Sequence, residues 1–201
     1  MPISGETDMN ALTVKDLYSL EQYARMRPEF RAKVIEHKNS RRVPLGEHAA
    51  LYFEDALTMQ YQVQEMMRLE RVVEPELIQE ELDVYNPLIP DGSNWKATFM
   101  VEYPDEEERR AALARLIGIE KAVWVQVEGF PTIAPIANED LERETEDKTS
   151  SVHFLRFELI PEMVAAAKRG AGLRAGIEHP CYRVTVDLPQ TVRLSLVGDL
   201  Q

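Results

Sequence analysis

The side chains best suited to chemistry lie on one face of a long predicted helix. Residues 48–72 contain neither proline nor glycine, and their apolar side chains recur at helical spacing. Within this segment a polar set is spaced so that its members share one helix face: Glu54, Thr58, Tyr61, Glu65 and, at the margin, Arg68. Such a face could line a polar cavity and supply a general acid or base. A solvated stripe on a surface helix is the alternative.

A basic segment lies immediately before this helix. Between residues 25 and 42 there are seven lysines and arginines but only two acidic residues. The segment supplies candidate ligands for a phosphate or a carboxylate: Arg31, His37, Lys38, Arg41 and Arg42. The sequence has no GxGxxG or Walker motif, so a glycine-rich phosphate loop is not predicted. Ion pairs with the acidic remainder of the protein are the alternative.

The histidines and the single cysteine offer few metal ligands. No Glu-x-x-His or His-Glu-x-x-His sequence occurs, which argues against a di-iron bundle and a zinc-protease site. Cys181 cannot form a CxxC pair or an intrachain disulfide. His153 and His179 are the remaining candidates, but we expect His153 on the core face of a strand and His179 on an outer face. We therefore expect no metal site, and no motif indicates a cofactor.

The candidate residues of the long helix and the basic segment depend on a helical first half. Thr13 can cap a first helix, and Pro28 fits the first turn of a second one. The long helix follows at residues 48–72, and a further helix is predicted over residues 75–84. The first half is therefore predicted to be helical, with one long helix.

The second half changes character after a cluster of helix-breaking residues at 86–92. This cluster predicts a boundary between a helical region, 1–90, and an α+β region, 91–201, which could also form one continuous domain. Strands and helices are predicted in the order β-α-β-β-α-β plus a terminal helix, over residues 95–103, 104–117, 122–128, 151–159, 161–169, 182–188 and 189–200. That order is typical of a ferredoxin-like antiparallel sheet, so the predicted fold class is α+β.

The composition restricts the class of partner. A formal net charge of −12 opposes binding to nucleic acid and to anionic membrane surfaces. No apolar run approaches the roughly 18–20 residues of a membrane span, and residues 1–6 lack the features of a signal peptide, so we expect a cytoplasmic protein. Six of the nine residues in 139–147 are acidic, which predicts a solvated loop, with docking of a partner as the alternative.

Four stretches carry a distinctive pattern: residues 46–54 (GEHAALYFE), 64–68 (QEMMR), 152–157 (VHFLRF) and 178–182 (EHPCY). They resemble the bacterial family called domain of unknown function 3501, and the similarity extends over about residues 12–200. The family has no assigned activity. The resemblance implies neighbouring genes for rubrerythrin-type proteins and cysteine-rich iron–sulfur oxidoreductases, and hence an accessory role beside such a partner in redox or oxidative-stress chemistry.

Two functional hypotheses remain open. The first is a cytoplasmic accessory or interaction protein, because the acidic loop could dock a partner and the amides of Gln60 and Gln64 suggest a helix–helix or subunit contact. A homodimer through the long helix is a related prediction. The second hypothesis is a small-molecule- or metal-binding enzyme that uses the Glu/Tyr face of the long helix beside the basic anion site.

Overall fold

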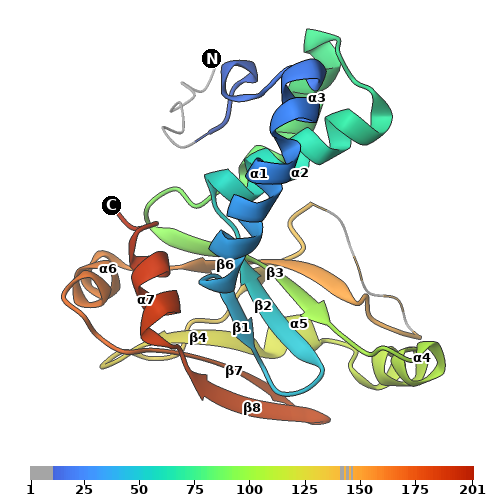
Figure 1. Cartoon of the computed structure of the whole chain (residues 1–201). Helices are drawn as coiled ribbons and strands as arrows, with labels where there is room; N and C mark the ends of the chain where they lie inside the picture. The colour runs from blue at the N-terminus through green and yellow to red at the C-terminus, as the bar shows by residue number, and fades with distance from the viewer. Residues whose placement is uncertain (1–10, 141–142, 144, 146) are drawn as a thin grey trace, which may run out of the picture.

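The computed structural model describes residues 11–140, 143, 145 and 147–201, and it shows a helical arm rising from a body of two β-sheets (Figure 1). The arm contains η1 (Val14–Asp16), α1 (Leu20–Asn39), α2 (Ala56–Glu70), α3 (Pro75–Tyr85) and η2 (Asn86–Leu88). Helices predominate in the first half of the chain and strands in the second, which confirms the predicted α+β class. No helix in the described ranges is long and apolar enough to cross a membrane.

The body contains two antiparallel sheets. Its strands are β1 (Arg42–Pro44), β2 (Ala49–Phe53), β3 (Asn94–Val101), β4 (Val123–Val127), β5 (Ile136–Ala137), β6 (Val152–Glu158), β7 (Leu173–His179) and β8 (Tyr182–Asp187). The larger sheet has the order β1-β2-β3-β6-β5, and the smaller sheet has the order β4-β7-β8. The body also contains α4 (Glu106–Arg115), α5 (Ile119–Ala122), α6 (Pro161–Lys168) and the predicted terminal helix α7 (Gln190–Val197).

The strands are not arranged as a ferredoxin-like sheet. The four predicted strands are present as β3, β4, β6 and β8, but β3 and β6 belong to the larger sheet and β4 and β8 to the smaller one. Strand β7, which separates β4 from β8, is not among the predicted strands because Ala175 and Gly176 weaken its strand pattern. Gly176 is needed there, since a Cβ atom would lie 2.4 Å from Cζ2 of Trp124.

The predicted helix over residues 48–72 divides into strand β2 and helix α2. Ala49, Ala50, Leu51 and Phe53 are all buried, and β2 has hydrogen-bonded neighbours on both sides, β1 and β3. A central strand position outweighs the helix propensity of these residues, which is why the single-helix prediction is wrong. Strands β1 and β2 thus belong to a sheet whose other strands follow residue 90. The predicted boundary between a helical region, 1–90, and an α+β region, 91–201, stays a prediction.

Helix α1 is largely exposed along one side of the arm, and it runs without a break through Pro28. The prediction that Pro28 begins a second helix is therefore wrong. Tyr23, Phe30 and Val34 are buried along one side of α1, where it packs on α2. This packing sustains the helix at the point where proline removes one backbone hydrogen bond.

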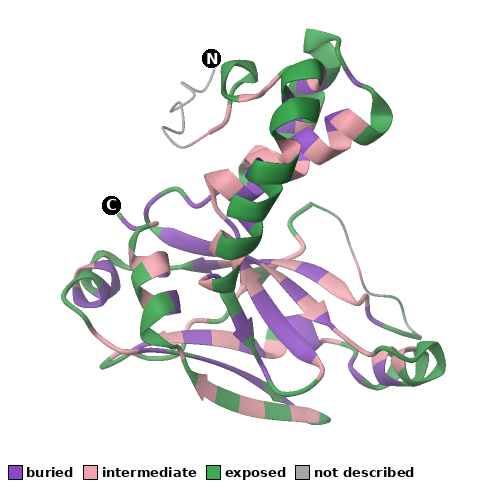
Figure 2. Cartoon of the chain, in the orientation of Figure 1, coloured by how far each residue is buried: buried purple, intermediate pink, exposed green. Residues whose placement is uncertain are grey.

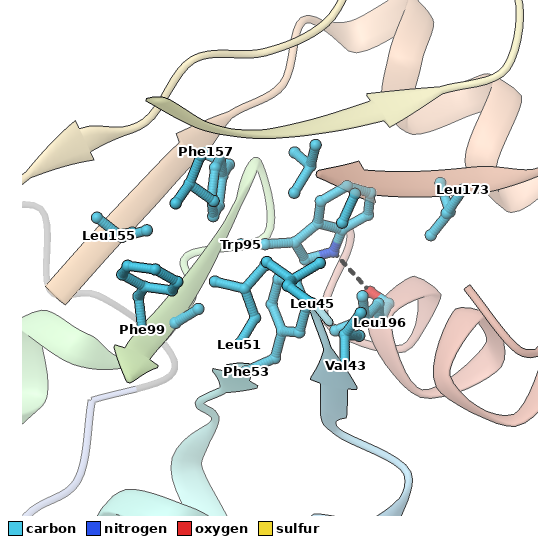
Figure 3. Packing of buried hydrophobic residues seen from close by; sticks show 14 of the residues in the cluster. Val43, Leu45, Leu51, Phe53, Trp95, Phe99, Leu155, Phe157, Leu173 and Leu196 are labelled. Atoms are coloured by element: carbon cyan, nitrogen blue, oxygen red, sulfur yellow. Dashed lines mark hydrogen bonds between the residues drawn. The ribbon is translucent and has the colours of Figure 1, made fainter. Parts of the chain in front are cut away.

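The main core lies in the body, where apolar side chains from both sheets meet (Figure 3). Trp95 and Phe99 of β3 are fully buried, and from Trp95 to Val101 buried residues alternate with half-buried ones. The indole Nε1 of Trp95 donates a hydrogen bond of 2.9 Å to the carbonyl oxygen of Leu196, which ties α7 to the core (Figure 3). Strand β8 alternates between exposed and partly buried residues, so it forms an outer edge of the body (Figure 2).

Candidate functional site

The predicted polar face is not continuous, because Glu54 precedes α2 while its companions lie on that helix. Glu54 is buried after β2, and its Oε1 accepts a hydrogen bond of 2.7 Å from the hydroxyl of Thr98 on β3. Thr58 is buried in the first turn of α2, where its amide donates a hydrogen bond of 2.9 Å to Oδ1 of the N-cap residue Asp55. Both residues therefore stabilise the junction between β2 and α2.

The remaining members of the predicted face, Tyr61, Glu65 and Arg68, stabilise the arm. The Glu65 carboxylate accepts hydrogen bonds from the Tyr23 hydroxyl (2.6 Å), from Nε and Nη2 of Arg27 (2.7 and 3.0 Å) and from Arg68 (3.0 Å). These hydrogen bonds, above all those from Arg27, lower the pKa of Glu65 to about 2. Tyr61 packs with the aromatic side chains of α1. A carboxylate held in this way is a poor general base.

The basic segment does not converge on one anion site. Arg31 is exposed on the arm, and Lys38 lies over an aromatic ring of α2. Arg42 is hydrogen-bonded on the outer face of the larger sheet. His37 and Arg41 come close to a shared carboxylate where the arm meets the body.

Arg41 is the centre of this junction, and its side chain is only 2% exposed. Its guanidinium donates hydrogen bonds to the carbonyl oxygens of Phe53 and Glu54 (2.9 Å each) and to Oγ of Ser195 (3.0 Å). It also donates to both carboxylate oxygens of Asp199, at 3.2 and 2.6 Å. These five hydrogen bonds occupy the donors of the guanidinium, so Arg41 is not available to bind an anion.

Two carboxylates complete what we call the junction cluster: His37, Arg41, Asp55 and Asp199. Oδ2 of Asp55 lies 2.5 Å from Nε2 of His37 and 3.3 Å from Nε of Arg41. Burial opposes the ionisation of Asp55, but the charge of Arg41 and the hydrogen bonds of Thr58 and His37 lower its pKa overall. Burial raises the pKa of Asp199, although Arg41 acts against this. The pKa values of the two carboxylates are thus shifted in opposite directions.

A groove of about 250 Å³ adjoins the junction cluster, and its lining includes Asp55, Leu57, Ile89, Pro90, Asp199 and Gln201. Both carboxylates in this lining already bind Arg41, so the main effect of the cluster is to join the arm, the larger sheet and the C-terminal segment. Helix-start rules would have identified Asp55 if the start of α2 had been predicted correctly. Asp199 has no comparable signal, since it lies 158 residues from Arg41.

His153 and His179 are buried in different sheets. The ring nitrogens of His153 lie 3.1 Å from Nδ2 of Asn138 and 2.9 Å from the carbonyl oxygen of Ser150. The expectation that His179 follows an outer face is wrong, because it ends β7 with its ring buried and 3.1 Å from the carbonyl oxygen of Ile117. Within the described residues, no three His, Cys, Asp or Glu side chains are grouped to hold a metal ion.

A second groove, of about 360 Å³, lies at the tip of the arm, and its lining includes Val14, Leu17, Leu20, Met67, Val73 and Ile78. We call it the arm-tip groove. Gln64 supports one wall: its Oε1 accepts a hydrogen bond of 2.5 Å from the Tyr18 amide, and its Nε2 donates one of 3.2 Å to the Tyr18 carbonyl. Gln60 donates to the carbonyl of Asp16 at 2.5 Å. The two amides thus bind the segment before α1 within the same chain.

The chain is similar in fold and sequence to a protein of known structure. A crystal structure of a novel protein of unknown function from Burkholderia pseudomallei K96243 is similar with a TM-score of 0.90 and 49% identity, covering 95% of this chain and 100% of that chain. No curated protein sequence matches significantly. The family described as protein of unknown function (DUF3501) matches residues 11–200. The chain therefore belongs to the DUF3501 family.

Proposed function

We propose that this chain is an accessory protein that binds another protein through the tip of its helical arm. The observation that carries the proposal is the arm-tip groove, which lies on an element that projects from the body (Figure 1). Val73 on this groove is 59% exposed, and Leu69 at the end of α2 is 63% exposed. Large apolar side chains exposed together are typical of interaction sites.

The groove suits an apolar side chain on an amphipathic helix of the partner. Leu17, Leu20 and Ile78 contribute aliphatic side chains, and Met67 contributes a flexible thioether that adapts to the shape of a bound group. Ser19 and Gln22 add polar groups that can accept or donate hydrogen bonds to the partner. Burial of one leucine or phenylalanine of the partner would contribute about 1.5–3 kcal/mol.

The partner we propose is an iron–sulfur oxidoreductase or a rubrerythrin-type protein in the cytoplasm. Support for this class comes from the family resemblance alone. The net charge of −12 disfavours nucleic acid and anionic membranes as partners. An accessory protein of this kind would contribute to redox or oxidative-stress chemistry by positioning its partner.

The alternative function, a small-molecule- or metal-binding enzyme, has weaker support. Its candidate acids and bases, Glu54 and Glu65, are hydrogen-bonded to neighbouring side chains that stabilise the fold. One of its candidate anion ligands, Arg41, uses all of its guanidinium donors in hydrogen bonds within the chain. The protein-binding function has better support, because the arm-tip groove includes an exposed apolar side chain, that of Val73.

Calorimetric titration with purified partner candidates tests the proposal. The candidates are a rubrerythrin-type protein and an iron–sulfur oxidoreductase, the two partner classes that the family resemblance implies. We expect Val73→Asp to weaken binding at least about tenfold, because it places a charge in the apolar groove. Leu194→Asp is the matched control, since Leu194 is 55% exposed but lies on α7 in the body. Equal binding by wild type and Val73→Asp, or no binding to either candidate, would contradict the proposal.

A further inference from the structure

Helix α1 exposes a second face that the fold leaves uncovered. Only three of its 20 residues are buried. Pro28, Arg31 and Ile35 are all exposed, with Ile35 at 47%, and their spacing of three and four residues places them on one side of the helix. This face therefore has a cationic centre between two apolar positions.

Helix α3 exposes a face with the opposite charge. Ile78 and Leu82 are its buried residues, whereas Leu77 and Val84 are 43% and 65% exposed. Glu80 and Glu81 lie between these two apolar residues at helical spacing, so the acidic centre is flanked by apolar positions on both sides. The helix carries four acidic residues and no basic one.

The charges on these two faces are not neutralised within the chain. Among the described residues, Arg31, Glu80 and Glu81 take part in no ion pair. Burial, together with the negative charges of Glu70 and Glu80, raises the pKa of Glu81. A cation brought to this face from another molecule would relieve that repulsion.

We infer that the partner of these faces is a second copy of this chain, with the Pro28/Arg31/Ile35 face of one protomer against the Leu77/Glu80/Glu81/Val84 face of the other. Both faces have the order apolar, charged, apolar over eight residues, so the charges and the apolar groups match. With the apolar positions aligned, Glu80 lies opposite Arg31 when the two helices run parallel. Glu81 lies opposite Arg31 when they run antiparallel. Each chain carries both faces, so a two-fold pairing forms the same contact twice.

This dimer is independent of the proposed partner-binding function. None of the residues that form the two faces belongs to the arm-tip groove. A dimer that fails to form would leave the groove proposal standing, and the loss of partner binding in Val73→Asp would leave the dimer standing. Two chains joined along their arms would present two arm-tip grooves to one partner or to two.

Sedimentation equilibrium of the full chain tests the inference by measuring mass against protein concentration and salt. We expect twice the chain mass of 23.0 kDa, with dissociation favoured by high salt because the central contact is an ion pair. Arg31→Glu and the double variant Glu80→Arg/Glu81→Arg should each weaken the dimer at least about tenfold, because each places like charges opposite one another. A monomeric wild type, or an assembly that grows beyond a dimer, would overturn the inference.

Mixing the two charge-reversed variants is the decisive measurement. In the mixture, both inter-chain contacts again join opposite charges, so a heterodimer should form from two proteins that each dimerise only weakly alone. This recovery also shows that both variants are folded. Lys33→Glu is the control for net charge, since Lys33 is exposed two residues after Arg31 and points to another side of α1. No heterodimer on mixing, or equal weakening by Lys33→Glu, would contradict the assignment of these faces.

Discussion

Arg41 and Asp199 are 158 residues apart in the chain, yet the guanidinium of Arg41 donates hydrogen bonds of 2.6 and 3.2 Å to the two carboxylate oxygens of Asp199. The pair fastens the segment after α7 to the start of β1, at the base of the arm. Arg41 is 2% exposed and Asp199 is 11% exposed, so water screens the attraction only weakly.

Removal of the positive charge of this pair should destabilise the fold strongly. We expect Arg41→Met to lower the free energy of unfolding by about 3–5 kcal/mol, because the carboxylates of Asp55 and Asp199, only 17% and 11% exposed, lose their ion pairs with Arg41. Urea denaturation followed by circular dichroism measures the change. Arg42→Met is the control: its ion pair with Glu102 is partly exposed, and its loss should cost less than about 1 kcal/mol. Similar losses for both variants would show that Arg41 does not hold the junction.

The stability of the arm should depend on pH through Glu65. The pKa of this carboxyl is about 2 in the folded protein, against an ordinary value of 4.5. A lowered pKa means that the stabilisation is fully present above about pH 4.5 and is lost as the pH falls towards 2. Urea denaturation between pH 2 and 6 should show a shallower pH dependence for Glu65→Gln than for wild type. Parallel curves for the two proteins would refute this role of Glu65.

Gly176 should not tolerate a side chain. A Cβ atom at this position would lie 2.4 Å from Cζ2 of Trp124 and 2.5 Å from the backbone oxygen of Val184. Gly176→Ala should therefore destabilise the smaller sheet by about 1–3 kcal/mol, measured by thermal or urea unfolding. Gly172→Ala is the matched control, since the nearest atom is the carboxylate end of Glu128, which can move. An unchanged stability of Gly176→Ala would mean that Trp124 repacks freely.

Replacement of Pro28 should stabilise the arm. Pro28→Ala restores a backbone donor in the middle of α1, and we expect a gain of about 1–3 kcal/mol after the greater flexibility of the unfolded chain is deducted. Pro75→Ala should give no such gain, because Pro75 begins α3 where the backbone amide has no helical partner. Calorimetric melting of both variants measures the difference. A lower melting temperature for Pro28→Ala would show that the arm needs the proline for its shape.

Short-range sequence patterns predicted the helices and strands whose conformation follows from local residue preferences. The alternation around Trp95 and Phe99 predicted β3, and the proline at position 75 together with the apolar residues that follow predicted α3. The acidic first turn after Asp105 similarly predicted α4. In each case the spacing of apolar residues and the helix-start signals agree, so no distant contact is needed to choose between helix and strand.

The sequence by itself thus determined the α+β class and most helices and strands of the second half, because periodicity and capping act over a few residues. Tertiary structure alone decided that Ala49 to Phe53 form a strand, since the stability of this strand depends on its hydrogen-bonded partners β1 and β3. It also decided that β4 and β8 lie in a separate sheet, through β7 and the contact of Gly176 with Trp124. Likewise, only folding brings Asp199 to Arg41, because a contact between residues so distant in the chain depends on every element between them.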